Sequence, residues 1–222
     1  MGFQFRFEPV LAAWPELLEG AWLTIQLSLA AMAIGLVVAV LCALAKTSGP
    51  KPVRVVVDFY IEIVRNTPFL VQIFFIYFGL PALGLRLSPG NAALLALVFN
   101  VGAYAAEIIR SGIEAVPRGQ IEAGIALGLK PLSIFRHIVL KPALRATFPA
   151  LTSQFTLLML STSVLSAISA DELTSMANNI QSRTFSSFEV YLVVTVIYFA
   201  IYMLFSAMFA LINRRAFSYP SK

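Results

Sequence analysis

Long apolar stretches alternate with short polar segments along the chain. An α-helix needs about 20 mostly apolar residues to cross the hydrocarbon core of a bilayer. Five stretches meet this requirement, at about residues 22–45, 53–80, 91–109, 150–168 and 190–212. Because a lipid-exposed backbone must satisfy its own hydrogen bonds, helices are expected rather than open strands. The pattern predicts an all-α membrane protein with five transmembrane helices in a single domain, residues 1–222.

Composition narrows the functional class. The chain is 59% hydrophobic and 12% charged, with a mean hydropathy of +0.84. A soluble domain carries about 25% charged residues, so a soluble enzyme, a nucleic-acid-binding domain and a disordered chain are excluded. The single cysteine, Cys42, allows neither an internal disulfide nor a cysteine-based metal cluster.

Catalytic chemistry has no clear place in the sequence. The chain holds no Ser-His-Asp order, no metal-ligand cluster and no catalytic carboxylate pair. Its one histidine, His137, lies between basic residues, where we expect a solvated interfacial role. The phosphate-binding pattern G-x-x-x-x-G-K-[ST] is absent, so ATP hydrolysis by that route is not expected. We therefore predict neither enzyme activity nor a cofactor in this chain.

The positions of the basic residues predict the topology. Lysine and arginine concentrate in the segments 46–54, 110–145 and 214–222, whereas the opposite side offers Arg6, Arg86 and Arg183. Positively charged loops favour the cytoplasmic side, so we expect the N-terminus outside and the C-terminus in the cytoplasm. The net charge of +5 is thereby explained without a nucleic-acid partner.

The first nineteen residues do not have the pattern of a signal peptide. A signal peptide combines a basic start with a short apolar core. This segment instead carries three glutamates against Arg6, and Pro9 and Pro15 interrupt it. An amphipathic surface helix or a loop is expected.

Residues 111–145, which we call the elbow, are too patterned for a simple connection. Three punctuating residues mark the exit from the third span: Gly112, Pro117 and Gly119. Ile121, Ile125 and Leu129 then share one face of a short helix, with Glu122 in its first turn. Periodicity leaves two interpretations open. The helix could rest on the lipid surface, or it could be presented to a groove on a soluble partner.

A family resemblance emerges at this point. Residues 107–145 read EIIRSGIEAVPRGQIEAGIALGLKPLSIFRHIVLKPALR and resemble the cytoplasmic signature loop of binding-protein-dependent ABC importer permeases. The matching residues are Glu122, Ala123, Gly124 and Gly128. Two further stretches are typical of the polar amino acid branch, namely VPRGQ at 116–120 and RNTPFLVQIFFIYFGLP at 65–81.

The resemblance covers residues 22–217 and includes three departures. Gly124 replaces the usual second alanine. Lys141 and Pro142 stand where the branch more often has Pro-Gln, so the second elbow helix is expected to begin or bend one residue later. Leu160 and Ser161 stand where the branch often has Lys-Asp.

The resemblance implies a type I ABC importer in the bacterial inner membrane. In that family two permease chains, identical or related, form the pathway for the solute. Two cytoplasmic ATPases bind ATP and magnesium and grip the elbows, and an extracytoplasmic binding protein delivers a polar amino acid or a related solute. The residues implied to contact the ATPase are Ile121, Glu122, Ala123, Gly124, Ile125, Gly128 and Leu129.

Polar residues at membrane depth suggest where a solute passes. Asp58, Glu62 and Arg65 share one face of the second span and are expected to form an internal ion pair. Pro68 should kink this span and free nearby carbonyls. Glu107 is expected to pair with Arg110. The pathway candidates are Arg65, Asn66, Thr67, Gln72, Asn100, Tyr104, Gln154, Ser161, Thr162 and Ser163.

Two other functional classes compete with the importer. An ion-coupled secondary transporter usually shows internal repeats across two halves, and five spans do not divide in this way. A membrane-embedded enzyme would need a catalytic constellation, which the sequence lacks. The identity of the solute cannot be read from these patterns.

Overall fold

The computed structural model describes residues 5–216, and every regular element in that range is helical, as predicted. The α-helices are α1 (Glu8–Ala12), α2 (Trp14–Ser48), α3 (Lys51–Arg65), α4 (Phe69–Phe74), α5 (Pro89–Glu114), α6 (Arg118–Ala126), α7 (Pro131–Ile134), α8 (Leu140–Ser161), α9 (Leu173–Thr184) and α10 (Ser187–Ala216). The shorter π and 3-10 segments are η1 (Phe75–Gly79), η2 (Leu80–Leu83), η3 (Phe135–Val139) and η4 (Thr162–Ile168).

Four helical stretches of the described chain are long and apolar enough to cross a membrane by themselves: Trp14–Ser48, Pro89–Glu114, Pro131–Ile168 and Ser187–Ala216. A fifth span is present if Lys51–Arg65 and Phe69–Leu83 are counted together. These two pieces meet at an angle of 113°. The five expected spans are matched when this bent pair is counted as one broken span.

The break at Pro68 is larger than the kink expected from the sequence. Proline has no backbone N–H and disfavours helical geometry in the residue before it. Here α3 ends at Arg65, and Pro68 is extended, with φ −63° and ψ 137°, before α4 begins. The kinked span predicted over 53–80 is for this reason two separate helices.

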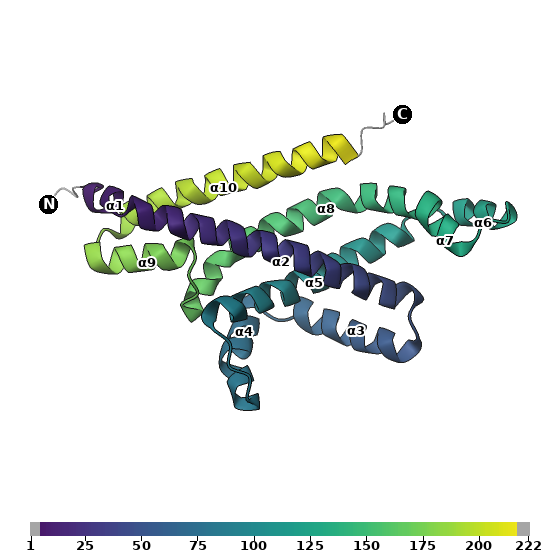
Figure 1. The fold of residues 1–222 in the computed structure, drawn as a ribbon, viewed down its shortest axis with the longest axis horizontal. Helices are drawn as coiled ribbons and strands as arrows, with labels where there is room; N and C mark the ends of the chain where they lie inside the picture. Colours follow the sequence, from purple (N-terminus) through teal and green to yellow (C-terminus); the bar gives the residue numbers. More distant parts are fainter. Residues whose placement is uncertain (1–4, 217–222) are drawn as a thin grey trace.

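The core of the bundle is the crossing of α2 and α5, and α8 packs against both helices (Figure 1). Small residues allow this close approach, as is usual between helices in membranes. A Cβ added to Gly35 of α2 would lie 2.2 Å from Cγ1 of Val101. A Cβ on Gly112 would lie 2.0 Å from Cγ2 of Thr147. Gly112 is therefore a packing residue inside α5 and not the exit from the span, which corrects its interpretation as punctuation.

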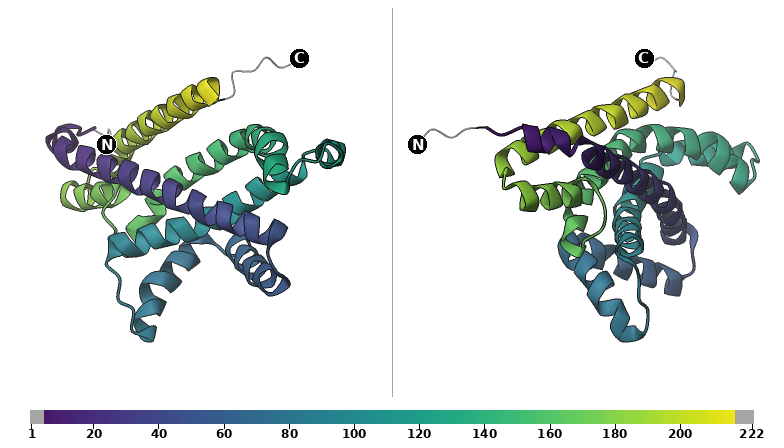
Figure 2. Two further views of the ribbon diagram at one scale, coloured as in Figure 1. Left: turned by 45° about the vertical axis from the view of Figure 1, so that its right-hand side comes forward. Right: turned by 60° about the vertical axis from the view of Figure 1, so that its left-hand side comes forward.

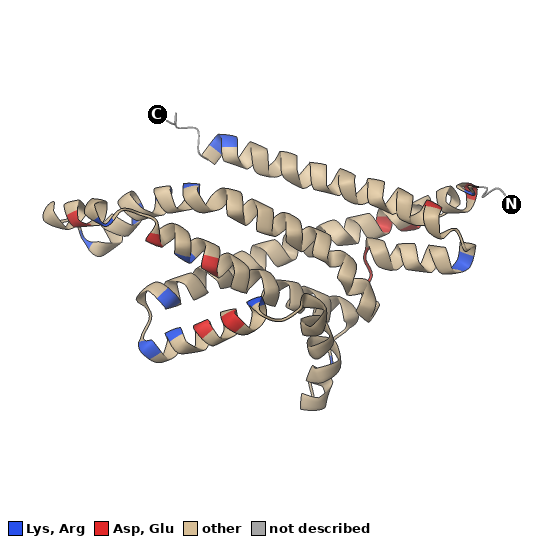
Figure 3. Ribbon diagram, turned by 180° about the vertical axis from the view of Figure 1, so that it is seen from behind, with Lys and Arg blue, Asp and Glu red and all other residues tan. Residues whose placement is uncertain are grey.

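The two ends of the bundle carry different elements. The α2–α3 turn, α6 and the C-terminal end of α10 lie at one end, and α1 and α9 lie at the other (Figures 1 and 2). Most lysine and arginine residues of the described chain gather at the end that holds α6 (Figure 3). The charge asymmetry inferred from the sequence is thus also an asymmetry in space.

The N-terminal segment and residues 173–184 differ from expectation. Pro15 does not interrupt the chain, because it occupies the first turn of α2, where proline is tolerated. The first membrane helix accordingly begins at Trp14, well before residue 22. Helix α9 was not predicted from the sequence. Leu173 at its start joins it to α2 by donating its amide to Oγ1 of Thr24 at 3.1 Å.

Candidate functional sites in the broken span and the elbow

Gln72 holds the two halves of the broken span together. Its side chain is 8% exposed. Nε2 donates to the carbonyl oxygens of Val64 (2.8 Å) and Thr67 (3.1 Å) and to the Thr67 hydroxyl (3.0 Å). These groups lost their helical partners at the break, so the amide replaces the interrupted helical hydrogen bonds. Because both amide hydrogens are used, Gln72 contributes to the site by fixing its shape.

Two polar residues of α5, Asn100 and Tyr104, bond to the residues of the break. Nδ2 of Asn100 donates to Oε1 of Gln72 at 3.0 Å. The Tyr104 hydroxyl donates to the Arg65 carbonyl at 3.4 Å, and the Arg65 guanidinium lies 5.6 Å from the centre of the Tyr104 ring. Asn66 donates to the carbonyl of Glu62. The structure therefore brings together six of the predicted pathway residues: Arg65, Asn66, Thr67, Gln72, Asn100 and Tyr104.

An ionic cluster beside the break joins α2, α3 and α5. Lys46 donates to the carboxylates of Asp58 (2.8 Å) and Glu107. Arg110 donates to Glu107 through Nε (3.0 Å) and Nη2 (2.9 Å), which confirms the predicted pair. Glu107 is thus the shared anion of two cations on different helices.

The internal ion pair expected within α3 does not form. Asp58 is taken by Lys46 of α2, and Nη1 of Arg65 lies 4.0 Å from Oε2 of Glu107. Within residues 5–216, Glu62 has no cation within 4.0 Å. The prediction failed because helical spacing on α3 alone took no account of the better-shielded carboxylate that α5 supplies.

A cavity of about 370 Å³ opens beside this cluster. Its lining consists of Lys46, Asp58, Ile61, Glu62, Arg65, Asn66, Tyr104 and Glu107. The cavity therefore combines both signs of charge with the broken end of α3.

The pathway candidates of the fourth span do not line the cavity at α3. Ser161 and Ser163 donate to carbonyls of their own helix, and the buried Thr162 donates to the Met159 carbonyl. Gln154 is half-buried on α8. The segment η4 contacts α4 and α5, so this part of the chain lies near the break although its hydroxyls are already bonded.

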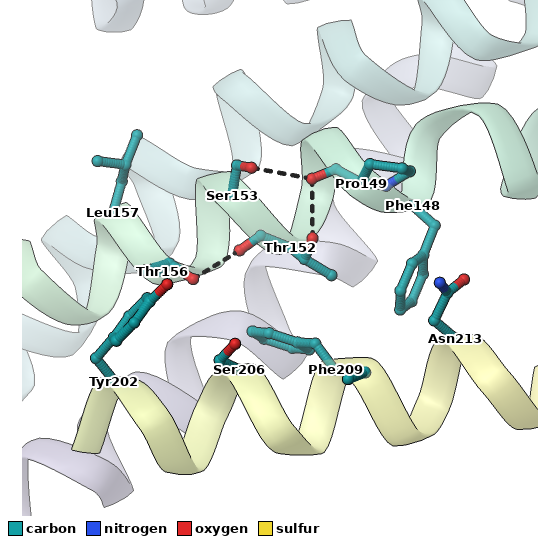
Figure 4. Close-up of a pocket in the computed structure, with 11 residues that line it drawn as sticks. Phe148, Pro149, Thr152, Ser153, Thr156, Leu157, Tyr202, Ser206, Phe209 and Asn213 are labelled. Atoms are coloured by element: carbon teal, nitrogen blue, oxygen red, sulfur yellow. Dashed lines mark hydrogen bonds between the residues drawn. The ribbon is translucent and has the colours of Figure 1, made fainter. Parts of the chain in front are cut away.

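A second groove of about 530 Å³ runs between α8 and α10 (Figure 4). Thr152 and Ser153 both donate to the Pro149 carbonyl, at 2.8 and 3.1 Å. Tyr202 points across the groove toward Thr156, and Ser206 lies beside it (Figure 4). Because the α8 hydroxyls bond to their own helix, this groove is less suited to binding a solute than the cavity at α3.

The elbow helix α6 differs in detail from the sequence prediction. It begins at Arg118, so Glu122 lies in the second turn and not the first. It ends at Ala126 because Gly128 adopts φ +73°. The amides of Gly128 and Leu129 then donate to the carbonyls of Ile125 and Gly124, the Schellman arrangement. Leu129 therefore follows the helix.

Only part of the predicted coupling set is open to a partner. Gly124 is buried, and a Cβ there would lie 2.7 Å from Ile138 of the same chain. Ile121 is half-buried against a small apolar cluster that contains Val116 and Ile134. The other predicted residues are exposed: Glu122, Ala123, Ile125, Gly128 and Leu129. Two leucines outside the predicted coupling set are also exposed, Leu127 at 79% and Leu132 at 77%.

The elbow continues directly into the fourth span. Pro131–Ile168 forms one helical stretch, whose α-helical hydrogen-bond pattern changes at the π-segment η3, at Pro149 inside α8 and at the 3-10 segment η4. Lys141 and Pro142 lie in the first turn of α8, which begins at Leu140 directly after η3, and the missing N–H of Pro142 is tolerated there. One helical stretch thus links the elbow to η4.

Glu172 is a buried carboxyl that the sequence analysis did not single out. It caps α9 by accepting from the amides of Thr174 (2.8 Å) and Ser175 (2.6 Å) and from the Tyr198 hydroxyl (2.9 Å). Burial raises the pKa of this carboxyl above its usual value, and the hydrogen bonds oppose that change. The only local signal is a glutamate shortly before a Thr-Ser pair.

Known proteins resemble this chain in both sequence and fold. The family described as binding-protein-dependent transport system inner membrane component matches residues 28–218. The L-cystine transport system permease protein TcyB of Bacillus subtilis (strain 168) is 37% identical over 94% of this chain and 90% of that protein. The glutamine transport system permease protein GlnP of Escherichia coli (strain K12) is 36% identical over 96% of this chain and 98% of that protein.

Solved structures agree with the sequence comparisons. The crystal structure of an amino acid ABC transporter with histidines contains a chain that is 36% identical, with a TM-score of 0.89 over 96% of this chain and 100% of that chain. An inward-facing conformation of the MetNI methionine ABC transporter has a TM-score of 0.75 at 22% identity, over 92% of this chain and 98% of that chain. The second likeness concerns the fold alone.

Proposed function

The chain belongs to the family of binding-protein-dependent transport system inner membrane components, and on this premise we propose that it moves an amino acid across the inner membrane by alternating access, driven by ATP hydrolysis in partner subunits. ATP and magnesium bind to those subunits, and this chain holds no cofactor. A second permease chain, identical or related, completes the pathway. An extracytoplasmic binding protein delivers the solute to the end of the bundle that holds α9.

The exposed apolar tip of the elbow carries this proposal. Ile125, Leu127 and Leu132 are 62%, 79% and 77% exposed at the most basic end of the bundle. An apolar helix end of this kind suits insertion into a groove on a soluble subunit. Positively charged segments favour the cytoplasmic side, and this supports an orientation with the elbow, the α2–α3 turn and the C-terminus in the cytoplasm.

The shape of the chain suggests how force reaches the solute. ATPase closure moves α6, and the continuous stretch Pro131–Ile168 carries that movement to η4. Because η4 contacts α4 and α5, it can shift the helices on which the break is built. The broken span then changes the side from which the pathway is open.

Uptake by a reconstituted complex tests the proposal. Proteoliposomes hold the permease with its ATPase and receive the binding protein outside, together with one labelled amino acid from the set L-glutamine, L-cystine, L-histidine, L-arginine, L-aspartate and L-leucine. We expect uptake of at least one when ATP is enclosed and none with a non-hydrolysable analogue. Uptake that persists without the ATPase and collapses with an ionophore would support the ion-coupled transporter instead.

A further inference from the structure

An apolar cavity of about 470 Å³ lies among α2, α5, α8 and α10. Its walls include Leu44 near the end of α2 and Ile113 near the end of α5, so it lies in the half of the bundle nearest the elbow. The two threonines in its walls, Thr147 and Thr152, donate their hydroxyls to carbonyls of α8. Packed protein interiors hold few voids larger than a water molecule. The cavity is therefore room for an apolar ligand.

This cavity is continuous with the groove between α8 and α10. Three residues line both spaces: Phe148, Thr152 and Phe209. The groove opens at the surface of the bundle, because Ser206 and Ala210 on its α10 wall are exposed. An apolar chain in the surrounding lipid thus has an entrance to the cavity between these two helices.

One end of the groove is flanked by cations of α8. Phe148 and Asn213 lie at this end, and Tyr202 lies at the other (Figure 4). Lys141 and Arg145 precede Phe148 by seven and three positions, so they continue the same side of α8 toward the elbow. Both are exposed.

Helix α10 adds a further cation, and acidic residues do not balance the charge. Arg214 directly follows Asn213 and is exposed. Within residues 5–216, no carboxylate lies within 4.0 Å of Lys141, Arg145 or Arg214. Residues 123–170 contain neither aspartate nor glutamate. The entrance to the apolar cavity is therefore positively charged at its Phe148 end.

We propose that this space binds an anionic phospholipid, with one acyl chain in the apolar cavity and the phosphate-bearing headgroup at Lys141, Arg145 and Arg214. The inference goes beyond the proposed function, because lipid binding here does not depend on the solute that is moved. Basic pockets between transmembrane helices bind acidic lipid headgroups. The flexible stems of lysine and arginine let their charged ends reach the membrane surface.

A second copy of the chain fits this space less well. A helix with its side chains is about 10 Å across and fills roughly 120 Å³ per residue, so the cavity of about 470 Å³ admits roughly one turn. A single acyl chain is narrower and can follow the groove inward. A second copy would also bring its own basic end, because most lysine and arginine residues of the described chain gather there (Figure 3), and like charges repel.

Photocrosslinking with two lipids tests the assignment. The full chain, with the subunits that co-purify with it, is placed in nanodiscs of dioleoylphosphatidylcholine. These contain a trace of phosphatidylglycerol or phosphatidylcholine with a diazirine at the end of one acyl chain, and labelled peptides are mapped by mass spectrometry. The two probes share their acyl chains and differ in the charge of the headgroup.

The expected result is labelling of the cavity that depends on headgroup charge. Phosphatidylglycerol should label the buried wall residues Leu151 and Phe155 more strongly than phosphatidylcholine does. One basic residue near the membrane surface favours an acidic lipid about fivefold, so Arg145→Gln and Arg214→Gln should each lower phosphatidylglycerol labelling by about that factor. Labelling by phosphatidylcholine should not change. Arg118→Gln removes the same charge from an exposed position on α6 and should alter neither.

A second pair of variants tests the entrance. Ala210→Trp narrows the groove and should lower labelling of the cavity by both lipids. Ala207→Trp, exposed on the same helix but outside the groove, should retain the labelling of the wild type.

Three results would overturn the proposal. The first is equal labelling of the cavity by both lipids, and the second is a loss in Arg145→Gln no larger than in Arg118→Gln. The third is an unlabelled cavity together with a disulfide between two copies that carry Ala210→Cys in a Cys42→Ser background, since a second copy would then occupy the space. None of these results depends on uptake of an amino acid, so the proposed function is tested separately.

Discussion

The side-chain amide of Asn100 donates to the amide oxygen of Gln72 across 3.0 Å, which ties α5 to the outer half of the broken span. The same Gln72 donates through Nε2 to Val64 and Thr67 in the inner half. A single buried glutamine therefore fixes the geometry of the break from both sides. The break is therefore a specific part of the fold that is stabilised by hydrogen bonds.

Replacing Gln72 by leucine should destabilise the protein. Gln72→Leu leaves the Val64 and Thr67 carbonyls without their donor, and a buried unsatisfied polar group costs roughly 1–3 kcal/mol. We expect a lower midpoint for unfolding of the purified permease in a mild detergent. Asn100→Ala removes only one of these bonds and should cause a smaller loss. A Gln72→Leu variant as stable as the wild type would contradict the role assigned to this residue.

Gly112 should not tolerate a larger side chain. A Cβ there would lie 2.0 Å from Cγ2 of Thr147 and 3.1 Å from the Ala143 carbonyl oxygen. Overpacking of this kind costs roughly 1–3 kcal/mol, so Gly112→Val should lower the thermal unfolding midpoint. Gly90→Ala, on the same helix with nothing within 4 Å, is the matched control and should leave the midpoint unchanged. Equal midpoints for the two variants would refute close packing at the α5–α8 contact.

The stability contributed by Glu172 should depend on pH. Burial raises the pKa of this carboxyl in the folded chain, so its contribution is fully present below the unfolded pKa of about 4.3 and is lost as the pH rises through the folded pKa. The wild type should therefore lose stability relative to Glu172→Gln as the pH rises from about 4.3 toward neutrality. Thermal melts of both proteins across this range check the sign. A difference that is constant or grows in favour of the wild type would contradict it.

Gly128 should be required for the end of α6. Its φ of +73° is a conformation that costs other residues roughly 1 kcal/mol. Gly128→Ala should weaken the hydrogen bond from the Leu129 amide to the Gly124 carbonyl, which measures 3.1 Å. Faster hydrogen exchange of the Leu129 amide would report this change. Gly119→Ala lies in open space on the same helix and should leave that exchange unaltered.

The sequence predicted what short-range patterns determine. The five apolar stretches were found because spanning a bilayer requires a local run of apolar residues. The Glu107–Arg110 pair was found because three residues on one helix fix its geometry. Gln72 and Asn100 were named as candidates, but only the fold shows that they bond to each other.

Features that depend on contacts between distant segments were predicted less well. Asp58 was assigned to Arg65, since nothing in the sequence shows that Lys46 of α2 lies closer. The size of the break at Pro68 depends on Gln72 and α5, which stabilise a bend that proline alone only permits. Glu172 was overlooked because its partner Tyr198 lies 26 residues away in the sequence.

The central claim is that a partner ATPase binds the exposed tip of the elbow. Leu127 is the natural probe, because its side chain is 79% exposed and a change there does not disturb the bundle. The matched control is Phe185, 86% exposed next to α9 at the opposite end. Each is replaced by aspartate.

The decisive measurement is the amount of ATPase that co-purifies with each permease variant from the membrane. Burying a charge at the centre of an interface weakens binding at least about tenfold, so Leu127→Asp should lose most of the ATPase while its own abundance is unchanged. Phe185→Asp should retain the wild-type amount. Full retention of the ATPase by Leu127→Asp, with normal ATP-dependent uptake, would contradict the account.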